Sequence, residues 1–168
     1  MNDRGGHDDR DGFGRATGYR DDSRDPHDLR RFLRAQEQDY DAALAEIRAG
    51  RKHSHWMWYV FPQYAGLGYS ETARRYAVGS LAEARAYLAH PVLGARLEEI
   101  SAALLRHRGR TLREIFGSPD DLKLRSCATL FAAVSPPGSI HERLLEAFCD
   151  GAPDARTLEL LREDGELA

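Results

Sequence analysis

Lysine and asparagine are nearly absent from this sequence of 168 residues. Beside 22 arginines it holds two lysines, Lys52 and Lys123, and one asparagine. This skew indicates a GC-rich coding bias rather than a structural demand. Because an ammonium differs from a guanidinium in shape, in hydration and in how readily its pKa shifts, the two remaining lysines are candidates for a specific role. Retention of the two by chance is the alternative.

Long apolar runs and paired cysteines are missing as well. No apolar stretch approaches the roughly 20 residues that a membrane-spanning helix needs, and the N-terminus is polar where a signal peptide would be hydrophobic. We therefore expect a cytoplasmic protein without a membrane partner. Cys127 and Cys149 show no CxxC spacing, which argues against a disulfide framework or a zinc knuckle and favours two buried thiols.

Familiar site signatures are missing too. There is no GxSxG, no P-loop and no GxGxxG, since Gly66-Leu67-Gly68 lacks the third glycine. A metal site on His53 and His55 would need a third ligand such as His90, and nothing in the sequence brings that residue near, so we predict no metal and no cofactor. The net charge of −3 argues against nucleic acid as the main partner, and a patch around Arg74, Arg75, Arg106, Arg108 and Arg110 is the weakest hypothesis.

What is present fits one globular domain. Hydrophobic residues make up 42% of the chain and charged residues 30%, as in ordinary folded proteins. The first 24 residues combine five glycines and eleven charges with almost no aliphatic side chains, so they offer little apolar surface to offset the entropy of ordering. We predict a flexible polar tail over residues 1–27 and a single domain over residues 28–168.

Apolar residues recur every three or four positions in several segments, as in amphipathic helices. The stripes are Leu29, Phe32, Leu33, Gln36, Tyr40, Leu44 and Ile47; Leu93, Leu97, Ile100 and Leu104; Leu124, Cys127, Phe131 and Val134; and Ile140, Leu144 and Phe148. Capping boxes are predicted at Ser80, Thr111, Ser118 and Ser139, each with an acid three residues later, and Asp154 is a further N-cap. With no alternating run that demands a sheet, the sequence predicts an all-α fold, a single irregular array of six to eight helices.

One segment departs from this pattern. Residues 51–64 read RKHSHWMWYVFPQY, with six apolar or aromatic residues in succession before Pro62. One interpretation places Trp56, Trp58 and Phe61 in the core. The other makes residues 51–70 line a pocket, where Lys52, His55 and Gln63 flank an aromatic wall suited to a planar ligand with an anionic group.

The segment DDLKLRSCATLF, residues 120–131, has two interpretations as well. On a helix, Lys123, Ser126 and Thr129 form a small polar strip. The alternative is that Asp121 caps the helix, that Lys123 is solvated, and that both hydroxyls bond their own backbone carbonyls.

These strings, together with AQEQDYDAALAEIRAG, EARAYLAHPVLGARL and DGAPDARTLELL, resemble the bacterial family known as domain of unknown function 1810, whose members often carry the name calpastatin. The resemblance implies an all-α fold of the α-α superhelix type and no established activity. The family's characteristic polar residues fall here on Lys52, His55, Gln63, Ser70, His90, Lys123, Ser126 and Thr129, with Trp56 and Trp58 between them. Family members commonly read SSMTLF where this chain has Cys127, which argues against a role for a second hydroxyl there. The calpastatin name has no support, because such an inhibitor would look disordered and repetitive.

Two functions are expected from these residues. The first is a small-molecule pocket for a nucleotide-like or aromatic anion, with catalysis left open. Its predicted ligand-binding residues are Lys52, His55, Trp56, Trp58, Gln63, Ser70, Lys123, Ser126 and Thr129, and His55 or Lys123 would move a proton if the site is catalytic. The second is a helical module that presents Trp56, Trp58 and Tyr59 to a protein partner.

Overall fold

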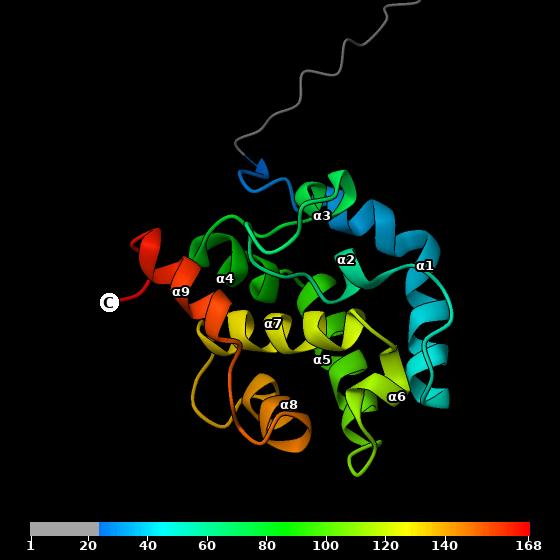
Figure 1. The fold of residues 1–168 in the computed structure, drawn as a ribbon. Coiled ribbons are helices and arrows are strands. Elements are labelled where there is room, and N and C mark those ends of the chain that lie inside the picture. Colours follow the sequence, from blue (N-terminus) through cyan, green and yellow to red (C-terminus); the bar gives the residue numbers. More distant parts are fainter. Residues whose placement is uncertain (1–23) are drawn as a thin grey trace, which may run out of the picture.

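Helices account for the regular structure of residues 24–168, the part of the chain that this computed structural model describes (Figure 1). They are α1 (Arg30–Ala49), α2 (Met57–Val60), α3 (Glu71–Arg75), α4 (Leu81–Ala89), α5 (Leu93–Leu105), α6 (Leu112–Phe116), α7 (Asp120–Ala132), α8 (Ile140–Phe148) and α9 (Ala155–Glu163). This part of the chain has no β-strand, and its β-type contacts are isolated bridges such as that of Tyr64 with Val78. The predicted all-α class is confirmed.

Two helices carry most of the packing. Helix α5 contacts α1, α4 and α8, and α7 contacts α4, α6, α8 and α9. Figure 1 shows α7 crossing the middle of the molecule, with α1 at one side and α9 at the other. The predicted stripe of α5 is buried along its whole length, from Leu93 to Leu104, and so are Leu124, Cys127 and Phe131 of α7. Burial of these stripes in one continuous core is what fixes the helices against each other.

Most of the predicted helix starts are observed. The side chains of Ser80, Thr111, Ser139 and Asp154 each accept a hydrogen bond from the backbone N–H three residues further on. The box predicted at Ser118 is wrong, because α7 has no side-chain cap and the N–H of Asp121 donates to the carbonyl of Gly117 instead. A backbone carbonyl has thus taken the place of the predicted hydroxyl.

Residues 25–27, the last of the predicted tail, contact the start of α1. The carboxylate of Asp25 accepts hydrogen bonds from the N–H groups of Leu29 and Arg30 at 2.8 and 3.1 Å. The carbonyl of His27 accepts a bond from Arg31. The rest of the predicted tail, residues 1–23, lies outside the described residues.

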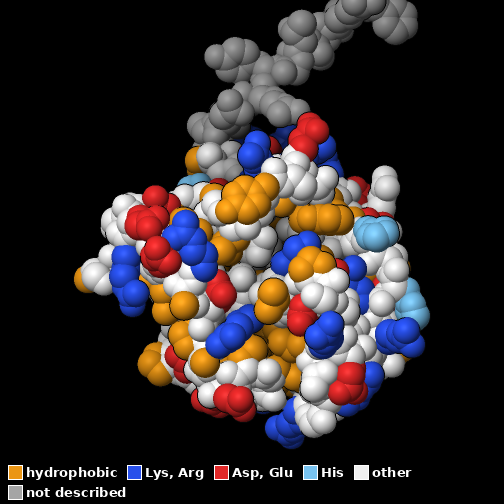
Figure 2. Space-filling view, viewed as in Figure 1, with side chains coloured by type: hydrophobic (Ala, Val, Ile, Leu, Met, Phe, Trp, Pro, Cys, Tyr) orange, Lys and Arg blue, Asp and Glu red, His pale blue; other side chains and the backbone are white. Residues whose placement is uncertain are grey.

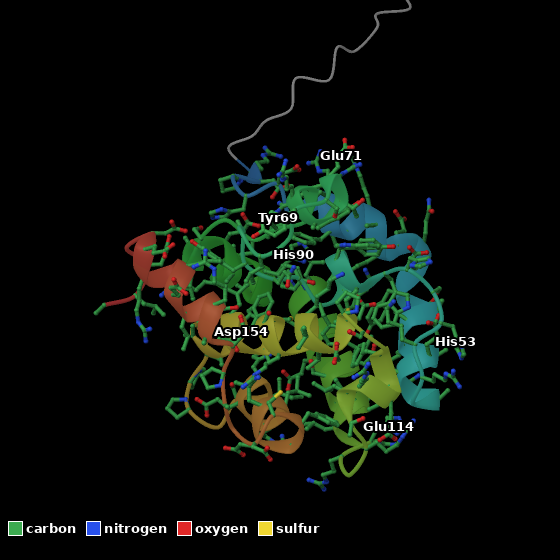
Figure 3. The ribbon with its side chains drawn as sticks, in the orientation of Figure 1. His53, Tyr69, Glu71, His90, Glu114 and Asp154 are labelled. Atoms are coloured by element: carbon green, nitrogen blue, oxygen red, sulfur yellow. The ribbon has the colours of Figure 1, made fainter. Side chains whose placement is uncertain are left out.

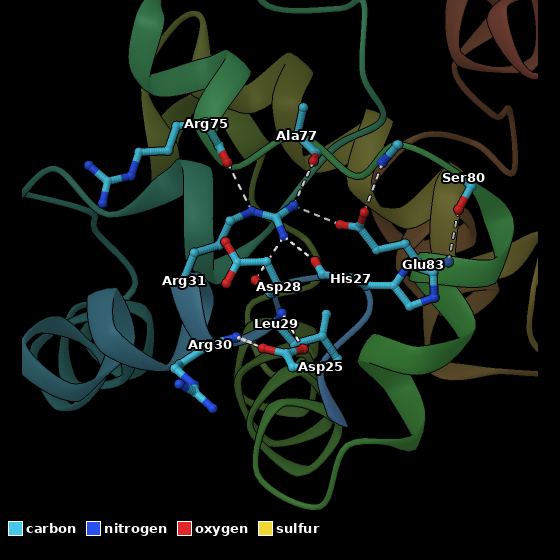
Figure 4. A network of polar contacts seen from close by, with 11 residues as sticks. Asp25, His27, Asp28, Leu29, Arg30, Arg31, Arg75, Ala77, Ser80 and Glu83 are labelled. Carbon is cyan, nitrogen blue, oxygen red and sulfur yellow. Dashed lines mark hydrogen bonds and ion pairs between the residues drawn. The ribbon is translucent and has the colours of Figure 1, made fainter. Parts of the chain in front are cut away.

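Arg31 ties this N-terminal segment to the connection between α3 and α4 (Figure 4). Its guanidinium donates to four backbone carbonyls and one carboxylate at 2.6–2.9 Å: those of His27, Asp28, Arg75 and Ala77, and that of Glu83. Both charged side chains are largely withdrawn from water. The planar fork of arginine suits such a set of acceptors, which the compact ammonium of lysine could not reach together.

A second set of hydrogen bonds, centred on Glu46, holds the loop between α1 and α2. The carboxylate of Glu46 accepts hydrogen bonds from the backbone N–H groups of His53 and Ser54, from the hydroxyl of Ser54 and from the indole N–H of Trp56. Trp56 is fully buried and packs edge-on against Phe116 of α6. One carboxylate therefore sets the path of the chain into α2.

None of the helices in residues 24–168 combines the length and apolar character that crossing a bilayer requires.

Replacing Arg31 with lysine is expected to lower the free energy of unfolding by about 2–3 kcal/mol, because carbonyls of two chain segments lose their donor while the charge is kept. Urea unfolding followed by tryptophan fluorescence measures the loss. Arg30→Lys, an exposed position on the same helix turn, is the control and should stay within about 0.5 kcal/mol of the parent. Equal stability of the two variants would show that the clamp contributes nothing specific.

Glu46 should make stability depend on pH. Burial raises the pKa of this carboxyl, but the hydrogen bonds from Ser54, His53 and Trp56 outweigh it and lower the pKa from 4.5 to about 2. A lowered pKa in the folded state means that the stabilisation is complete above pH 4.5 and is lost as the pH falls towards 2. Glu46→Gln should therefore cost about 1–2 kcal/mol at neutral pH.

The same Glu46→Gln variant should approach the parent in urea unfolding at about pH 3. A difference between parent and variant that does not change with pH would contradict this role of the carboxylate.

Candidate functional site

A pocket of about 420 Å³ opens where the chain after α2 meets the first turns of α3, α7 and α9. Its lining consists of Trp58, Gln63, Leu67, Gly68, Tyr69, Ser70, Ala73, Pro119, Leu122, Lys123, Ser126, Asp154 and Arg156. Figure 3 labels Tyr69 and Asp154 on the face turned to the viewer, and Figure 2 shows hydrophobic side chains lying among cationic and acidic ones on that face. The pocket thus joins segments from both halves of the chain.

The wall of the pocket combines an aromatic surface with unpaired donors. Trp58 is half-buried, and within the described residues neither its indole N–H nor the side-chain amide of Gln63 has a hydrogen-bond partner. Tyr69 stands at the rim with 81% of its surface exposed, and Leu122 with 61%. Polar groups without partners beside exposed apolar surface are the features that ligand sites share.

Three charged side chains, those of Lys123, Asp120 and Lys52, are linked by ion pairs next to this wall. The Nζ atom of Lys123 lies 3.1 Å from Oδ1 of Asp120, and Nζ of Lys52 lies 2.9 Å from the other oxygen of that carboxylate. Each ammonium also lies over an indole ring, Lys123 at 5.2 Å from the centroid of Trp58 and Lys52 at 5.0 Å from that of Trp56. The two lysines of the chain therefore meet at one carboxylate.

Both lysines affect the ionisation of Asp120. Burial raises the pKa of its carboxyl, but the hydrogen bonds and charges of Lys52 and Lys123 outweigh that effect and lower the pKa below its usual value. The carboxylate is thus held ionised, and Lys123 meets the pocket as an ion-paired ammonium, which donates hydrogen bonds but has no free lone pair. This arrangement suits anion binding better than proton abstraction.

The predicted site residues fall into two groups. Trp58, Gln63, Ser70, Lys123 and Ser126 line the pocket together. The other four do not: Lys52 lies behind Asp120, His55 is exposed outside the lining, Trp56 is in the core, and Thr129 lines a different cavity between α7 and α8.

Several of the polar side chains have structural partners of their own. The hydroxyl of Ser126 donates to the carbonyl of Leu122, and that of Thr129 to the carbonyl of Arg125. The hydroxyls thus follow the alternative that the sequence left open for the polar strip of α7, whereas Asp121 does not cap the helix and Lys123 is ion-paired with Asp120. Ser70 caps α3 by accepting a bond from the N–H of Ala73.

His90 and the cysteines lie outside the pocket lining. The Nδ1 atom of His90 accepts bonds from the N–H groups of Val92 and Leu93, and so helps to start α5. Among the described residues, no cluster of His, Cys, Asp or Glu is arranged to hold a metal ion. Cys127 is buried, as predicted, and burial raises the pKa of its thiol, whereas Cys149 is half-buried. A nucleophilic role for Cys127 has no support in this environment.

Sequence reasoning missed the contribution of the C-terminal region. Asp154 was identified only as a cap, and its carboxylate indeed accepts bonds from the N–H and hydroxyl of Thr157. Arg156 at the rim forms ion pairs with Glu159 and Glu163. Both residues belong to the string DGAPDARTLELL, and Tyr69 to GLGYS. Those strings carried the signal, but one sequence does not reveal that they come together.

Comparison with known proteins gives a family without an assigned function. A crystal structure of the conserved hypothetical protein Rv1873 from Mycobacterium tuberculosis shares 49% sequence identity and superposes with a TM-score of 0.79. The match covers 82% of this chain and 98% of that one. No curated protein matches the chain.

The family profile described as "Protein of unknown function (DUF1810)" matches residues 26–161, which include α1 to α8, the pocket and most of α9. Together with the solved relative, this match shows that the chain belongs to the DUF1810 family.

Proposed function

We propose that the pocket beside Trp58 binds a small planar molecule that carries an anionic group, in the class of nucleotides and their fragments. The observation that carries this proposal is the unpaired amide of Gln63 and the ammonium of Lys123 around the exposed part of one indole. A volume of about 420 Å³ lies within the usual size of small-molecule sites.

Each part of such a ligand has a counterpart in the pocket. A flat ring can pack against Trp58 or under Tyr69, since aromatic faces stack with offset geometry. The amide of Gln63 offers one acceptor and two donors to the polar edge of the ring. Lys123 offers an ammonium to the anionic group, and a charge-assisted bond of this kind is roughly twice as strong as a neutral one.

Binding is better supported than catalysis. Of the groups that could move a proton, Lys123 is ion-paired with Asp120, Asp154 is occupied as a helix cap, and His55 lies outside the lining. The catalytic roles considered for His55 and Lys123 therefore gain no support from the geometry, and the cytoplasmic location stays a prediction from sequence.

The protein-interaction alternative now has fewer residues to rely on. Trp56 and Tyr59 are buried, which leaves Trp58 of the three predicted contacts. A partner would have to use the exposed side chains of Tyr69 and Leu122 at the rim of the same pocket. Small-molecule binding uses the concave part of this surface as well as its rim, and we prefer it for that reason.

A thermal-shift screen with adenosine monophosphate, NAD and sugar phosphates tests the proposal. A compound present at 100 times its dissociation constant should stabilise the folded parent by about 2.7 kcal/mol, seen as a rise in Tm. Gln63→Ala and Lys123→Met should lose most of that rise, because the groups that hold the ligand are gone.

The matched controls for this screen are Gln38→Ala and Arg143→Met, which change an exposed glutamine of α1 and an exposed cation of α8. Both should respond to the compound as the parent does. A panel without any stabilising compound, or a Tm rise that survives in both pocket variants, would contradict the proposed site.

A further inference from the structure

Lys123 of the pocket lining belongs to a cluster of three charged side chains, and the net charge of that cluster bears on ligand binding. Asp120 contributes one negative charge and Lys52 and Lys123 one positive charge each, so the cluster is cationic by one unit. With Lys123 and Asp120 alone it would be neutral.

Lys52 is placed for that effect without lining the pocket. Its side chain is 8% exposed, and its Nζ atom donates to the carbonyl of Ser54 at 2.6 Å in addition to pairing with Asp120. Its backbone N–H donates to the carbonyl of Ile115 at 2.7 Å, and the indole below it belongs to the core. These contacts fix the ammonium on the buried side of Asp120.

Lys123 occupies the other side of the carboxylate, with 24% of its side chain exposed. It lines the pocket while Lys52 does not. Of the other charged groups of the lining, Arg156 pairs with Glu159 and Glu163, and Asp154 accepts hydrogen bonds from the neutral Thr157 and keeps its negative charge. The lysine cluster is thus the source of the positive charge that lies over the indole of Trp58.

We propose that Lys52 is a positioning residue: by neutralising Asp120 from behind, it leaves the charge of Lys123 available to the anionic group of the ligand. This inference rests on the proposed function and names the part of the ligand that the inner end of the pocket selects. It also gives a physical role to the lysine that lies outside the lining.

The tryptophans allow this charge to be measured without a ligand. The chain has two, of which Trp56 is fully buried and Trp58 is half-exposed beneath Lys123. Collisional quenching by iodide therefore reports on anions near Trp58, and quenching by neutral acrylamide reports on its accessibility alone. The ratio of the two Stern–Volmer constants measures the local potential, because a positive site concentrates anions.

Lys52→Met should lower the iodide-to-acrylamide ratio roughly twofold at low salt, as expected for the loss of one charge several ångströms away. Asp120→Asn should raise the ratio, and the double variant Lys52→Met/Asp120→Asn should return close to the parent because its net charge is again one. Lys52→Arg should keep the parent ratio, and so should Arg143→Met, which removes an exposed cation of α8. Circular dichroism confirms that each variant is folded.

A ratio that stays unchanged in Lys52→Met, or that does not recover in the double variant, would overturn the inference. If Lys52→Met does not fold, Asp120→Asn and Lys52→Arg decide alone, since the first must raise the ratio and the second must leave it unchanged. Failure of the proposed function is seen separately, as a ligand screen without stabilisation, because the quenching experiment contains no ligand.

Discussion

The carboxylate of Asp120 joins two distant parts of the chain, since it pairs with Lys52 of the loop after α1 and with Lys123 of its own helix. Charges of this kind are costly to withdraw from water unless each has a partner. The cost is offset here by two ammonium groups, each of which also lies on an indole ring. The loop, the buried Trp56 and the pocket wall at Trp58 therefore keep a fixed relation to the first turn of α7.

The helical architecture could be read from the sequence because its signals are local. Apolar residues at helical spacing and capping side chains at Ser80, Thr111, Ser139 and Asp154 depend only on near neighbours, and they specified where most helices lie. Local reasoning failed where a backbone group could do the same task, as at Ser118. Nor could it find the acceptors of Arg31 on α3 and α4, which are remote in sequence.

The candidate site was only partly predictable for the same reason. Composition singled out Lys52 and Lys123, and tertiary packing brings both to one carboxylate. Which of the aromatic residues would be core and which surface was left open, and the structure divides them between Trp56 and Trp58. Tyr69, Asp154 and Arg156 could not be assigned, because only tertiary packing brings α9 to the chain that follows α2.

The scarcity of lysine has a practical chemical meaning. Most proteins spread their side-chain amines over the whole surface, so that acylating reagents, reductive methylation and amine-directed cross-linkers modify them at many unrelated places. In this chain both such amines belong to one cluster, and the more accessible of the two lines the pocket. Amine chemistry applied to this protein therefore acts on its candidate site, apart from the amino terminus, and carboxyl-directed coupling is the way to attach a label elsewhere.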